Sequence, residues 1–430
     1  MEADEARRLT ARADQLRTVM ALAEQAVEQG RPADEFLTGE FRRHRAWGSR
    51  DRRLISRLVF AAFRWRGWLG RYAEHGDRVL IGAHLLESAE RHPVIDRMIR
   101  ETGADPDAVP PWSGDALEAR AERVAGWLGF TPRWEQLVPD WVLEVLAAPA
   151  GVDRERLLYR CVESFQVRPP LWLRAVGLSE KQLAEKLAAF GLTAQPAERP
   201  PYAVRVEGQR PHLPTLDRAL GPCFEVQDLA SQCVGWAAGV GAGDHWWDVC
   251  AGAGGKALHL AAAGARVLAT DVRAAALAEA RRRTQRLGLQ EIEIARHDGT
   301  QPLTPAARFD GVLVDAPCSG LGMWARRPDA RWQITPQTIR SCADLQGRLL
   351  DNAARHVRPG GRLVYSVCTM TSAETIEVVR RFEERHPTFE AEAMEHPLQP
   401  GVSAHPLWIW PWDGPCGGMF IARWRNRADE

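Results

Sequence analysis

Short apolar segments alternate with helical segments over residues 245–298, and this alternation constrains the fold more than any other feature of the sequence. The segment HWWDVC at 245–250 leads into the glycine-rich stretch AGAGGK at 251–256 and then into a helix at 257–263. A strand at 265–271, a helix at 274–287 and a strand at 292–295 follow. Repeated β-α units of this kind predict a doubly wound, mainly parallel sheet, so the predicted fold class is α/β.

Two later apolar strands each end close to a cysteine. The first, at 311–314, stops at Asp315 and opens into a loop that contains Cys318, and the second, at 361–367, stops at Cys368. In open α/β sheets, ligands bind just beyond the carboxyl ends of the strands. We therefore expect Asp315, Cys318 and Cys368 to lie in one site.

The glycine-rich stretch predicts a nucleotide cofactor. Its glycines let the backbone approach a ligand, and the N-terminus of the following helix favours an anionic group. A dinucleotide is the default alternative, but the sequence shows no arrangement for hydride chemistry. S-adenosylmethionine instead offers a carboxylate for the glycine turn, a ribose for Asp271 and an adenine amine for Asp298. Asp248 and Asp298 are alternatively cap or turn residues.

The cysteines at the strand ends favour carbon over nitrogen as the methyl acceptor. Carbon 5 of cytosine is a poor nucleophile, but a thiolate that adds to carbon 6 turns the ring into an enamine that can attack a methyl sulfonium. A carboxylate beside the site holds the N3 and amino edge of the ring. Amine-methylating enzymes commonly place an aromatic residue here, as in D-P-P-Y, whereas this chain has DAPC at 315–318. A second thiol suits release of the covalent product.

The first 145 residues predict a helical bundle with a basic segment. Apolar residues recur at helical spacing over 7–30 and again over 53–72. Residues 42–71 contain ten arginines and one acid, Asp51. Such a patch attracts phosphates, and arginine interleaved with tryptophan also stacks on bases; a solvated helix face is an equally good interpretation. The candidate nucleic-acid-binding residues here are Arg43, Arg50, Arg52 and Arg53, and the family resemblance given below implies that the nucleic acid is RNA.

Composition excludes several classes of protein. No apolar run is long enough to cross a bilayer, and the N-terminus is charged where a secretion signal would be apolar, so we expect a cytoplasmic protein with no membrane partner. The eight cysteines show no CxxC spacing, so we expect neither a metal site nor disulfides. Formal net charge is zero. We expect a monomer.

The sequence resembles the RsmB/Sun family of RNA cytosine-5 methyltransferases along most of its length. The motifs that carry the resemblance are QDLASQ at 227–232, DVCAGAGGK at 248–256, DAPCSGLG at 315–322, RRPD at 326–329 with Trp332, YSVCT at 365–369 with Glu374, and GMFIA at 418–422. The segment WGSRDRR at 47–53 is similar to the NusB-like domain of the bacterial members.

Segments at 170–174 and 202–206 predict strands that flank a helix at 179–190, which indicates a small α+β unit. With the resemblance, three domains are expected: an all-helical NusB-like RNA-binding domain at 1–145, a small α+β linker or RNA-binding unit at 160–235, and a Rossmann-like class I methyltransferase domain at 236–430. The resemblance implies that Cys368 is the nucleophile, Cys318 the release thiol and Asp315 the base-binding carboxylate, with Lys256 also counted as catalytic. The implied S-adenosylmethionine site comprises Cys250, Ala251, Gly252, Ala253, Gly254, Gly255, Lys256, Asp271 and Asp298, bordered by Asp315. Arg326 and Arg327 join the candidate RNA-binding residues.

The bacterial members modify 16S ribosomal RNA, so the resemblance favours that RNA, or a small-subunit assembly intermediate, over tRNA. This chain departs from the family pattern at three places: Gly252-Ala253 replaces Ala-Pro, Val367 replaces threonine, and Ala175-Val176 replaces Val-Asn. The first two departures support an alternative, a catalytically silent RNA-binding assembly factor. A DNA cytosine methyltransferase is disfavoured because its single nucleophile follows proline.

Overall fold

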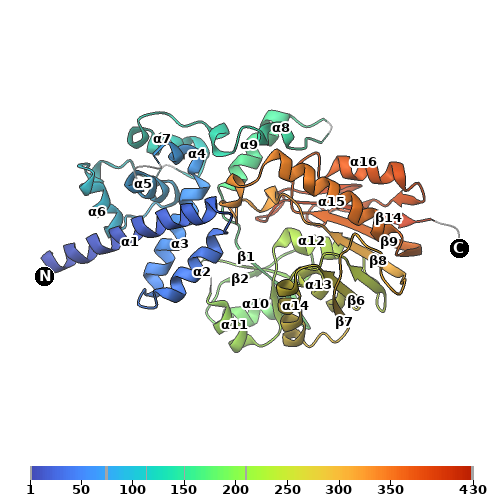
Figure 1. Ribbon diagram of the computed structural model, residues 1–430. Coiled ribbons are helices and arrows are strands. Elements are labelled where there is room, and N and C mark those ends of the chain that lie inside the picture. The colour runs from blue at the N-terminus through green and yellow to red at the C-terminus, as the bar shows by residue number, and fades with distance from the viewer. Residues whose placement is uncertain (1, 73–75, 113, 150, 209–210, 428–430) are drawn as a thin grey trace. The chain divides into compact units, whose positions relative to one another are not determined.

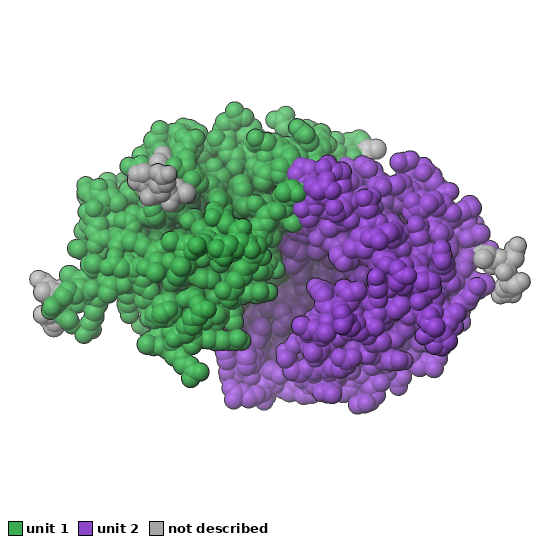
Figure 2. All heavy atoms as spheres, in the orientation of Figure 1, with its two compact units in different colours: residues 1–168, 324–335 green, residues 169–323, 336–430 purple. Residues whose placement is uncertain are grey.

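A computed structural model describes residues 2–72, 76–112, 114–149, 151–208 and 211–427 (Figure 1). The chain forms two compact units, which Figure 2 distinguishes by colour. Unit 1 comprises Met1–Arg168 and Trp324–Thr335, and unit 2 comprises Pro169–Met323 and Pro336–Glu430. Residues 324–335 therefore pack with the N-terminal unit, although they lie inside the range 236–430 predicted as the catalytic domain.

Unit 1 is built from helices whose apolar faces meet in its core. The helices are α1 (Glu2–Glu28), α2 (Ala33–Arg43), α3 (Ser49–Arg64), α4 (Arg66–Leu69), α5 (Gly76–Glu87), α6 (Pro93–Glu101), α7 (Leu117–Leu128), α8 (Val142–Val145) and α9 (Arg154–Phe165), with short 3-10 turns at Gly70–Tyr72, Pro106–Ala108, Trp134–Leu137 and Ala330–Trp332. In α1 the buried residues Leu16, Met20, Ala23 and Val27 recur at helical spacing, as the sequence predicts.

The helix predicted over 53–72 is interrupted at Trp65, between α3 and α4. Two residues later the chain makes a close backbone contact, because a Cβ added to Gly67 would lie 1.7 Å from the carbonyl oxygen of Gln136. Glycine is a weak helix former, and only glycine fits that approach. The apolar pattern alone could not show this interruption.

Unit 2 begins with a small α+β part. Its four-stranded antiparallel sheet has the order β2 (Ala194–Pro196), β3 (Ala203–Val206), β1 (Leu171–Ala175), β4 (Phe224–Val226). Helices α10 (Glu180–Ala189) and α11 (Leu213–Leu220) pack their leucines against it, with Leu173, Leu183, Leu187 and Leu216 fully buried. This arrangement agrees with the strands and the helix predicted around 169–206.

The large sheet of unit 2 has the order β10 (Phe389–Ala391), β14 (Met419–Asn426), β9 (Val357–Val367), β8 (Phe309–Asp315), β5 (His245–Asp248), β6 (Arg266–Asp271), β7 (Ile292–Arg296), with β13 (Leu407–Ile409) beside β14. Strands β5 to β9 are parallel, and β14 runs antiparallel to β9. From β5 the chain adds β6 and β7 on one side and β8 and β9 on the other. The order therefore reverses between β5 and β8, where ligands of such sheets bind.

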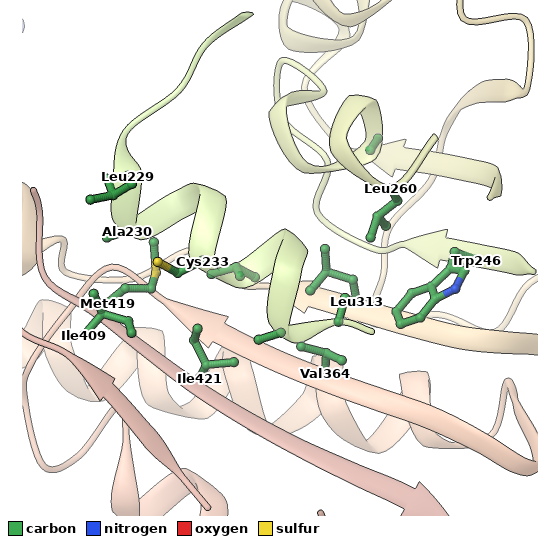
Figure 3. Packing of buried hydrophobic residues seen from close by; sticks show 14 of the residues in the cluster. Leu229, Ala230, Cys233, Trp246, Leu260, Leu313, Val364, Ile409, Met419 and Ile421 are labelled. Atoms are coloured by element: carbon green, nitrogen blue, oxygen red, sulfur yellow. The ribbon is translucent and has the colours of Figure 1, made fainter. Parts of the chain in front are cut away.

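Helices cover both faces of this sheet (Figure 1). Helices α12 (Leu229–Ala237) and α13 (Gly255–Ala262) cover one face, and α15 (Pro336–Ala354) and α16 (Ile376–Arg385) cover the other; α14 (Ala274–Leu287) packs beside β6 and β7. Figure 3 shows Cys233 of α12 close to Met419 of β14. The strand side chains alternate, because Leu313 joins the α12 core while Val312 and Val314 join the α15 core. The predicted α/β class is confirmed.

Three small elements complete unit 2: a 3-10 turn at Leu321–Met323 and the paired strands β11 (Met394–Glu395) and β12 (Ser403–Ala404). Within the described ranges, every helix is too short or too polar to span a membrane.

Candidate active site

The ends of β8 and β9 bring Asp315 beside Ser366. The two residues are register partners in neighbouring parallel strands. The Ser366 hydroxyl donates a hydrogen bond of 2.7 Å to Oδ1 of Asp315. Sequence reasoning missed Ser366, because the pairing depends on the register between strands that lie about fifty residues apart. The strand pairing thus orients one face of the Asp315 carboxylate.

Lys256 orients the other oxygen of the same carboxylate. It lies in the first turn of α13, and its Nζ is 2.6 Å from Oδ2 of Asp315 and 3.1 Å from the Ser231 hydroxyl. Burial lowers the pKa of the Lys256 ammonium, but the charge and hydrogen bond of Asp315 outweigh burial, so the net shift is upward. Lys256 therefore remains charged, and the structure places it against Asp315 as well as beside the glycine-rich turn.

The two predicted thiols are in contact. The Sγ atoms of Cys318 and Cys368 lie 3.3 Å apart, within hydrogen-bond distance for sulfur. The hydrogen bond to Cys368 raises the pKa of the Cys318 thiol well above its usual value, and burial adds to the rise. Cys318 is partly buried as a residue, and the burial of its sulfur disfavours the charged form of this thiol. The direction of the shift therefore favours a neutral Cys318.

Glu374, which is fully buried, holds the loop that carries Cys318. Its carboxylate accepts hydrogen bonds from the backbone N–H of Ser319 at 2.8 Å, from the Ser319 hydroxyl, and from the Thr371 hydroxyl at 2.8 Å. The Gln346 amide donates to Glu374 at 3.2 Å and to the Pro317 carbonyl at 2.9 Å. The sequence indicated Glu374 only as part of a motif, whereas the structure shows what it does: it fixes the loop after β8.

Glycines let the same loop pack against β14. The backbone N–H of Gly322 donates to the Cys368 carbonyl at 3.0 Å, and the N–H of Gly418 donates to the Gly322 carbonyl at 2.8 Å. A Cβ on Gly322 would lie 2.1 Å from the Gly418 carbonyl oxygen. Because the backbones approach so closely, a larger residue at 322 would displace the loop and, with it, the contact between the two thiols.

The turn between β5 and α13 has the shape of a ligand cradle. Gly252 and Gly254 have φ of 56° and 84°, which favour glycine, and α13 begins at Gly255. A Cβ on Gly255 would meet no atom within 4 Å, so open space lies over the helix N-terminus. The backbone N–H of Gly252 donates to Oδ2 of Asp271 at 2.9 Å, which ties the turn to the end of β6. We call residues 252–255 the cofactor turn.

Asp271 and Asp298 lie at the ends of adjacent strands but in different surroundings. Burial alone would raise the pKa of Asp271, yet the hydrogen bonds from Arg273, at 3.0 Å from its guanidinium and 2.8 Å from its backbone, bring the net shift downward. Asp298 is exposed and accepts hydrogen bonds from the backbone N–H and hydroxyl of Thr300, which lower its pKa. Asp298 therefore occupies the turn position that the sequence left open as an alternative.

Two further predicted cofactor residues, Cys250 and Ala251, directly precede the cofactor turn. The N–H of Ala251 donates to the Thr270 carbonyl at 2.8 Å, which continues the pairing of β5 with β6. Burial, with the nearby charge of Asp248, raises the pKa of the Cys250 thiol. Cys250 is therefore a neutral thiol beside the turn, and its chemistry differs from that of Cys368.

Asp248, at the end of β5, is a fully buried carboxylate beneath the site. Within the described part of the chain, neither of its oxygens has a hydrogen-bond partner. Burial and the charge of Asp315 raise the pKa of Asp248 to about 7, although Lys256 acts in the opposite direction. The sequence left Asp248 as a cap or turn residue, and its burial without partners marks it instead as part of the site floor.

The raised pKa of Asp248 predicts a pH-dependent stability. An unfolded aspartate titrates near about 4, so between about pH 4 and about pH 7 the folded state holds a proton that the unfolded state releases. This contribution is fully present below about pH 4 and is lost as pH rises through about 7. Urea unfolding should therefore show that, from about pH 5 to about pH 8, the wild type loses about 3 kcal/mol relative to Asp248→Asn. An equal change of unfolding free energy with pH in the wild type and Asp248→Asn would contradict this prediction. Asp344→Asn, which changes an exposed aspartate, is the control.

The predicted RNA-binding arginines of unit 1 fall into two groups. Arg43, Arg50 and Arg53 are exposed, although Arg43 also donates to Glu40 at 2.6 Å. Arg52 is half-buried and donates to the Trp47 carbonyl at 2.9 Å, which closes the loop before α3. The first three can reach a phosphate from the surface of α2 and α3, whereas Arg52 stabilises the loop.

The RRPD segment, also within unit 1, is anchored by buried polar groups. The Asp329 carboxylate is fully buried and accepts a 3.0 Å hydrogen bond from the N–H of Ala33, the first residue of α2. Arg331 is fully buried and donates to the carbonyls of Leu137 at 2.7 Å and Phe165 at 3.2 Å. Arg327, 3.7 Å from Asp329, is only partly exposed. This anchoring, which sequence reasoning missed, leaves Arg326 and Arg327 half-buried at the base of the segment.

The reversed strand order, the glycine turn after β5 and the antiparallel β14 beside β9 together define the fold of a class I methyltransferase. The crystal structure of PH0851 has the same fold: it superposes with a TM-score of 0.74 at 20% sequence identity, over 95% of this chain and 98% of that chain.

Sequence comparisons name the family. The model described as 16S rRNA methyltransferase RsmB/F matches residues 240–425. The chain is 34% identical over 295 residues to the probable ribosomal RNA small subunit methyltransferase B of Synechocystis sp., covering 66% of each chain. It is 33% identical over 279 residues to ribosomal RNA small subunit methyltransferase B of Citrobacter koseri, covering 63% of each. The chain matches just under two thirds of the length of these relatives.

Through residues 240–425 the chain belongs to the RsmB/F methyltransferase family, which confirms the resemblance found in its motifs. Membership of this family makes S-adenosylmethionine the cofactor.

Proposed function

We propose that this chain transfers a methyl group from S-adenosylmethionine to carbon 5 of a cytosine in 16S ribosomal RNA, through a covalent bond between Cys368 and carbon 6. The observation that carries the proposal is the 3.3 Å contact between Cys318 and Cys368 at the ends of adjacent strands, next to the Asp315 carboxylate. One thiol suffices for addition. A second thiol in contact with the first, beside a carboxylate held by Lys256, matches a reaction that must both form and release an adduct.

In the proposed reaction Cys368 attacks as a thiolate, and the Cys318 thiol, 3.3 Å away, can donate a hydrogen bond to it. The thiolate adds to carbon 6 and the displaced electron pair makes carbon 5 nucleophilic. When bound, the cofactor supplies an electrophilic methyl group to that carbon. Asp315 holds the N3 and amino edge of the ring, and its bonds to Lys256 and Ser366 keep the carboxylate in place as charge develops.

Release requires a base at carbon 5, and Cys318 is the proposed base. The hydrogen bond to Cys368 is the largest cause of the raised pKa of Cys318, and it weakens once the Cys368 sulfur is bound to carbon 6. Cys318 then gives its thiol proton to solvent. The Cys318 thiolate then takes the proton from carbon 5, the double bond re-forms, and the bond between carbon 6 and Cys368 breaks to return the Cys368 thiolate.

The residues of the cofactor turn fit the proposed site for S-adenosylmethionine. The backbone N–H groups at the start of α13 suit the methionine carboxylate, and the space over Gly255 admits it. Asp271 presents a carboxylate for the ribose hydroxyls, and Asp298 lies at the end of the next strand. Asp248, whose buried oxygens have no partner among the described residues, offers an acceptor for a cationic group.

Two observations support ribosomal RNA as the substrate. The relatives from Synechocystis and Citrobacter are named as methyltransferases of small-subunit ribosomal RNA. In unit 1, Arg43, Arg50 and Arg53 present exposed cations on α2 and α3. The test is to incubate the protein with S-adenosylmethionine labelled in its methyl group and, separately, 16S ribosomal RNA, tRNA or DNA. Label at carbon 5 of cytosine in 16S RNA is expected; label on tRNA or DNA alone would select another substrate, and no label would overturn the proposal.

The exposed arginines of unit 1 should govern the salt dependence of RNA binding. Each phosphate contact contributes to the slope of log K against log salt, so replacing Arg43, Arg50 and Arg53 with glutamine should reduce that slope by about 2 to 3. Affinity at low salt should fall with little change in the Kd for S-adenosylmethionine. Filter binding over a salt series measures the slope. The control replaces Arg218, Arg282 and Arg380, also exposed, to remove the same charge; an equal effect there would mean that net charge alone matters.

A further inference from the structure

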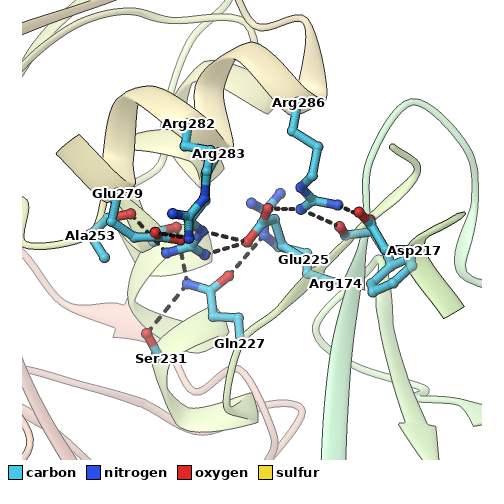
Figure 4. Close-up of polar contacts among 12 residues, drawn as sticks. Arg174, Asp217, Glu225, Gln227, Ser231, Ala253, Glu279, Arg282, Arg283 and Arg286 are labelled. Carbon is cyan, nitrogen blue, oxygen red and sulfur yellow. Dashed lines mark hydrogen bonds and ion pairs between the residues drawn. The ribbon is translucent and has the colours of Figure 1, made fainter. Parts of the chain in front are cut away.

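An arginine of α14, which lies outside the cofactor turn, donates a hydrogen bond to the backbone of that turn. Nη1 of Arg283, on α14, donates a 2.8 Å hydrogen bond to the carbonyl of Ala253, which lies between the two glycines with positive φ (Figure 4). Glycines on both sides leave a turn with many accessible conformations, and the turn contains no proline that would restrict it. A fixed donor to the carbonyl in the middle of the turn therefore selects one conformation.

Arg283 is itself fixed by a buried carboxylate. Nε of Arg283 lies 3.0 Å from Oε2 of Glu225, at the middle of β4, and Nη2 of Arg283 also donates to that oxygen. The Glu225 side chain is only 3% exposed, so it requires charged partners. Arg286, one helical turn along α14, donates to the other oxygen of Glu225 and to Asp217. The small α+β part thus supplies a rigid anchor for the arginine that touches the turn.

The charged side chains around Arg283 and Glu225 balance one another. Beside it lies a cavity of about 580 Å³ lined by Arg282, Arg283 and Arg286 and by Asp217, Glu225 and Glu279. Figure 4 shows each arginine turned toward one of these carboxylates. Three cations facing three anions give no excess charge for an anionic ligand. The arrangement is therefore suited to holding the backbone rather than to binding a phosphate.

A second set of hydrogen bonds connects the small α+β part to Gly255, the last residue of the cofactor turn. Nε of Arg174, on β1, donates to the Gln227 side chain at 2.8 Å, and the Gln227 amide donates to the Gly255 carbonyl at 3.4 Å and to Ser231 at 3.3 Å. Ser231 is the residue that also accepts from Lys256. The small α+β part therefore contacts both the middle and the end of the cofactor turn.

We propose that Arg283, clamped by Glu225, is a positioning residue that holds the cofactor turn in the conformation that binds S-adenosylmethionine. This inference rests on the proposed function in one respect, namely that residues 252–255 form the cofactor site. It assigns to the small α+β part a role in cofactor affinity.

Arg283→Gln in the full-length protein tests this inference. We expect the Kd for S-adenosylmethionine, measured by calorimetry without RNA, to rise about tenfold, because a charged donor to the turn is lost. In methyl transfer to ribosomal RNA, KM for the cofactor should rise similarly while kcat and KM for RNA change less than about twofold. Arg283→Lys, which retains one charged donor, should recover part of the affinity. Arg282→Gln is the matched control, since Arg282 is exposed on the same helix and pairs with Glu279.

The outcomes separate this inference from the proposed function. Asp271→Ala probes the cofactor site itself: if it leaves the Kd unchanged, the proposed site is wrong. If Asp271→Ala weakens binding but Arg283→Gln does not, the role assigned to Arg283 is overturned and the site stands. An equal loss in Arg282→Gln, or a fall in kcat without a rise in KM, would also overturn it. Should Arg283→Gln fail to fold, Glu225→Gln, which preserves side-chain shape, should raise the Kd about threefold, and an unchanged Kd would overturn the inference.

Discussion

Cys368→Ser is expected to lower the rate of methyl transfer to ribosomal RNA by at least about a thousandfold, because serine is far less acidic than cysteine and cannot supply an anion to carbon 6. The change removes one sulfur and leaves Asp315, Lys256 and the cofactor turn in place. Binding of S-adenosylmethionine and of RNA should therefore stay within about twofold of the wild type. Transfer of a labelled methyl group under single-turnover conditions measures the loss.

Cys223→Ser is the matched control for this experiment. Cys223 is a free, partly buried thiol in the small α+β part, where its Sγ donates to the Leu220 carbonyl at 3.4 Å. Its replacement should leave the rate almost unchanged. A Cys368→Ser protein that retains more than a tenth of wild-type activity would show that the nucleophile lies elsewhere. In that case Cys318, the other sulfur of the pair, becomes the candidate.

Cys318→Ala is expected to stop the reaction after the covalent bond has formed. Without the thiol that takes the proton from carbon 5, the adduct between Cys368 and carbon 6 cannot eliminate, so a protein–RNA complex that resists denaturation should accumulate. We expect about one methyl group transferred per protein, followed by a steady rate at least about a hundredfold below the wild type. Denaturing gels with labelled RNA measure the adduct, and the time course of label measures the burst.

The double variant Cys318→Ala/Cys368→Ser identifies the sulfur that forms the adduct. It should give no denaturation-resistant complex, since the nucleophile is absent. If Cys318→Ala instead turns over at the wild-type rate, the release role assigned to Cys318 is wrong. A complex that forms equally in the double variant would mean that another residue is bound to the RNA.

Much of the fold was predictable because its signals are local. The glycine turn, the apolar strands at β5, β6, β8 and β9 and the helices between them follow from short-range patterns, and the class α/β is confirmed. The helix predicted over 53–72 shows the limit of such patterns. Its apolar spacing continues through Trp65, but the interruption occurs near the contact of Gly67 with the Gln136 carbonyl. That contact joins residues far apart in the chain.

In the candidate site, too, the residues at strand ends were predictable from local patterns, whereas their contacts with distant residues were not. Asp315, Cys318 and Cys368 were predicted from the ends of two strands, and their roles stay predictions. The partners of these residues were not predictable: Ser366 depends on strand register, and Glu374 depends on how its buried carboxylate meets the loop at Ser319. The raised pKa of Asp248 was not predictable either, because it depends on burial by the fold and on the nearby charge of Asp315.

The sequence by itself determined the alternation of strands and helices over residues 245–298, the residues at the strand ends and the chemistry that those residue types favour. These properties follow from side-chain periodicity, glycine and proline positions and the reactivity of a thiol. Only the tertiary structure decided that the two sulfurs are in contact, which carboxylate is held by Lys256, and that Arg331 and residues 324–335 pack with unit 1. These depend on distances of a few ångströms between groups tens to hundreds of residues apart, which no local pattern specifies.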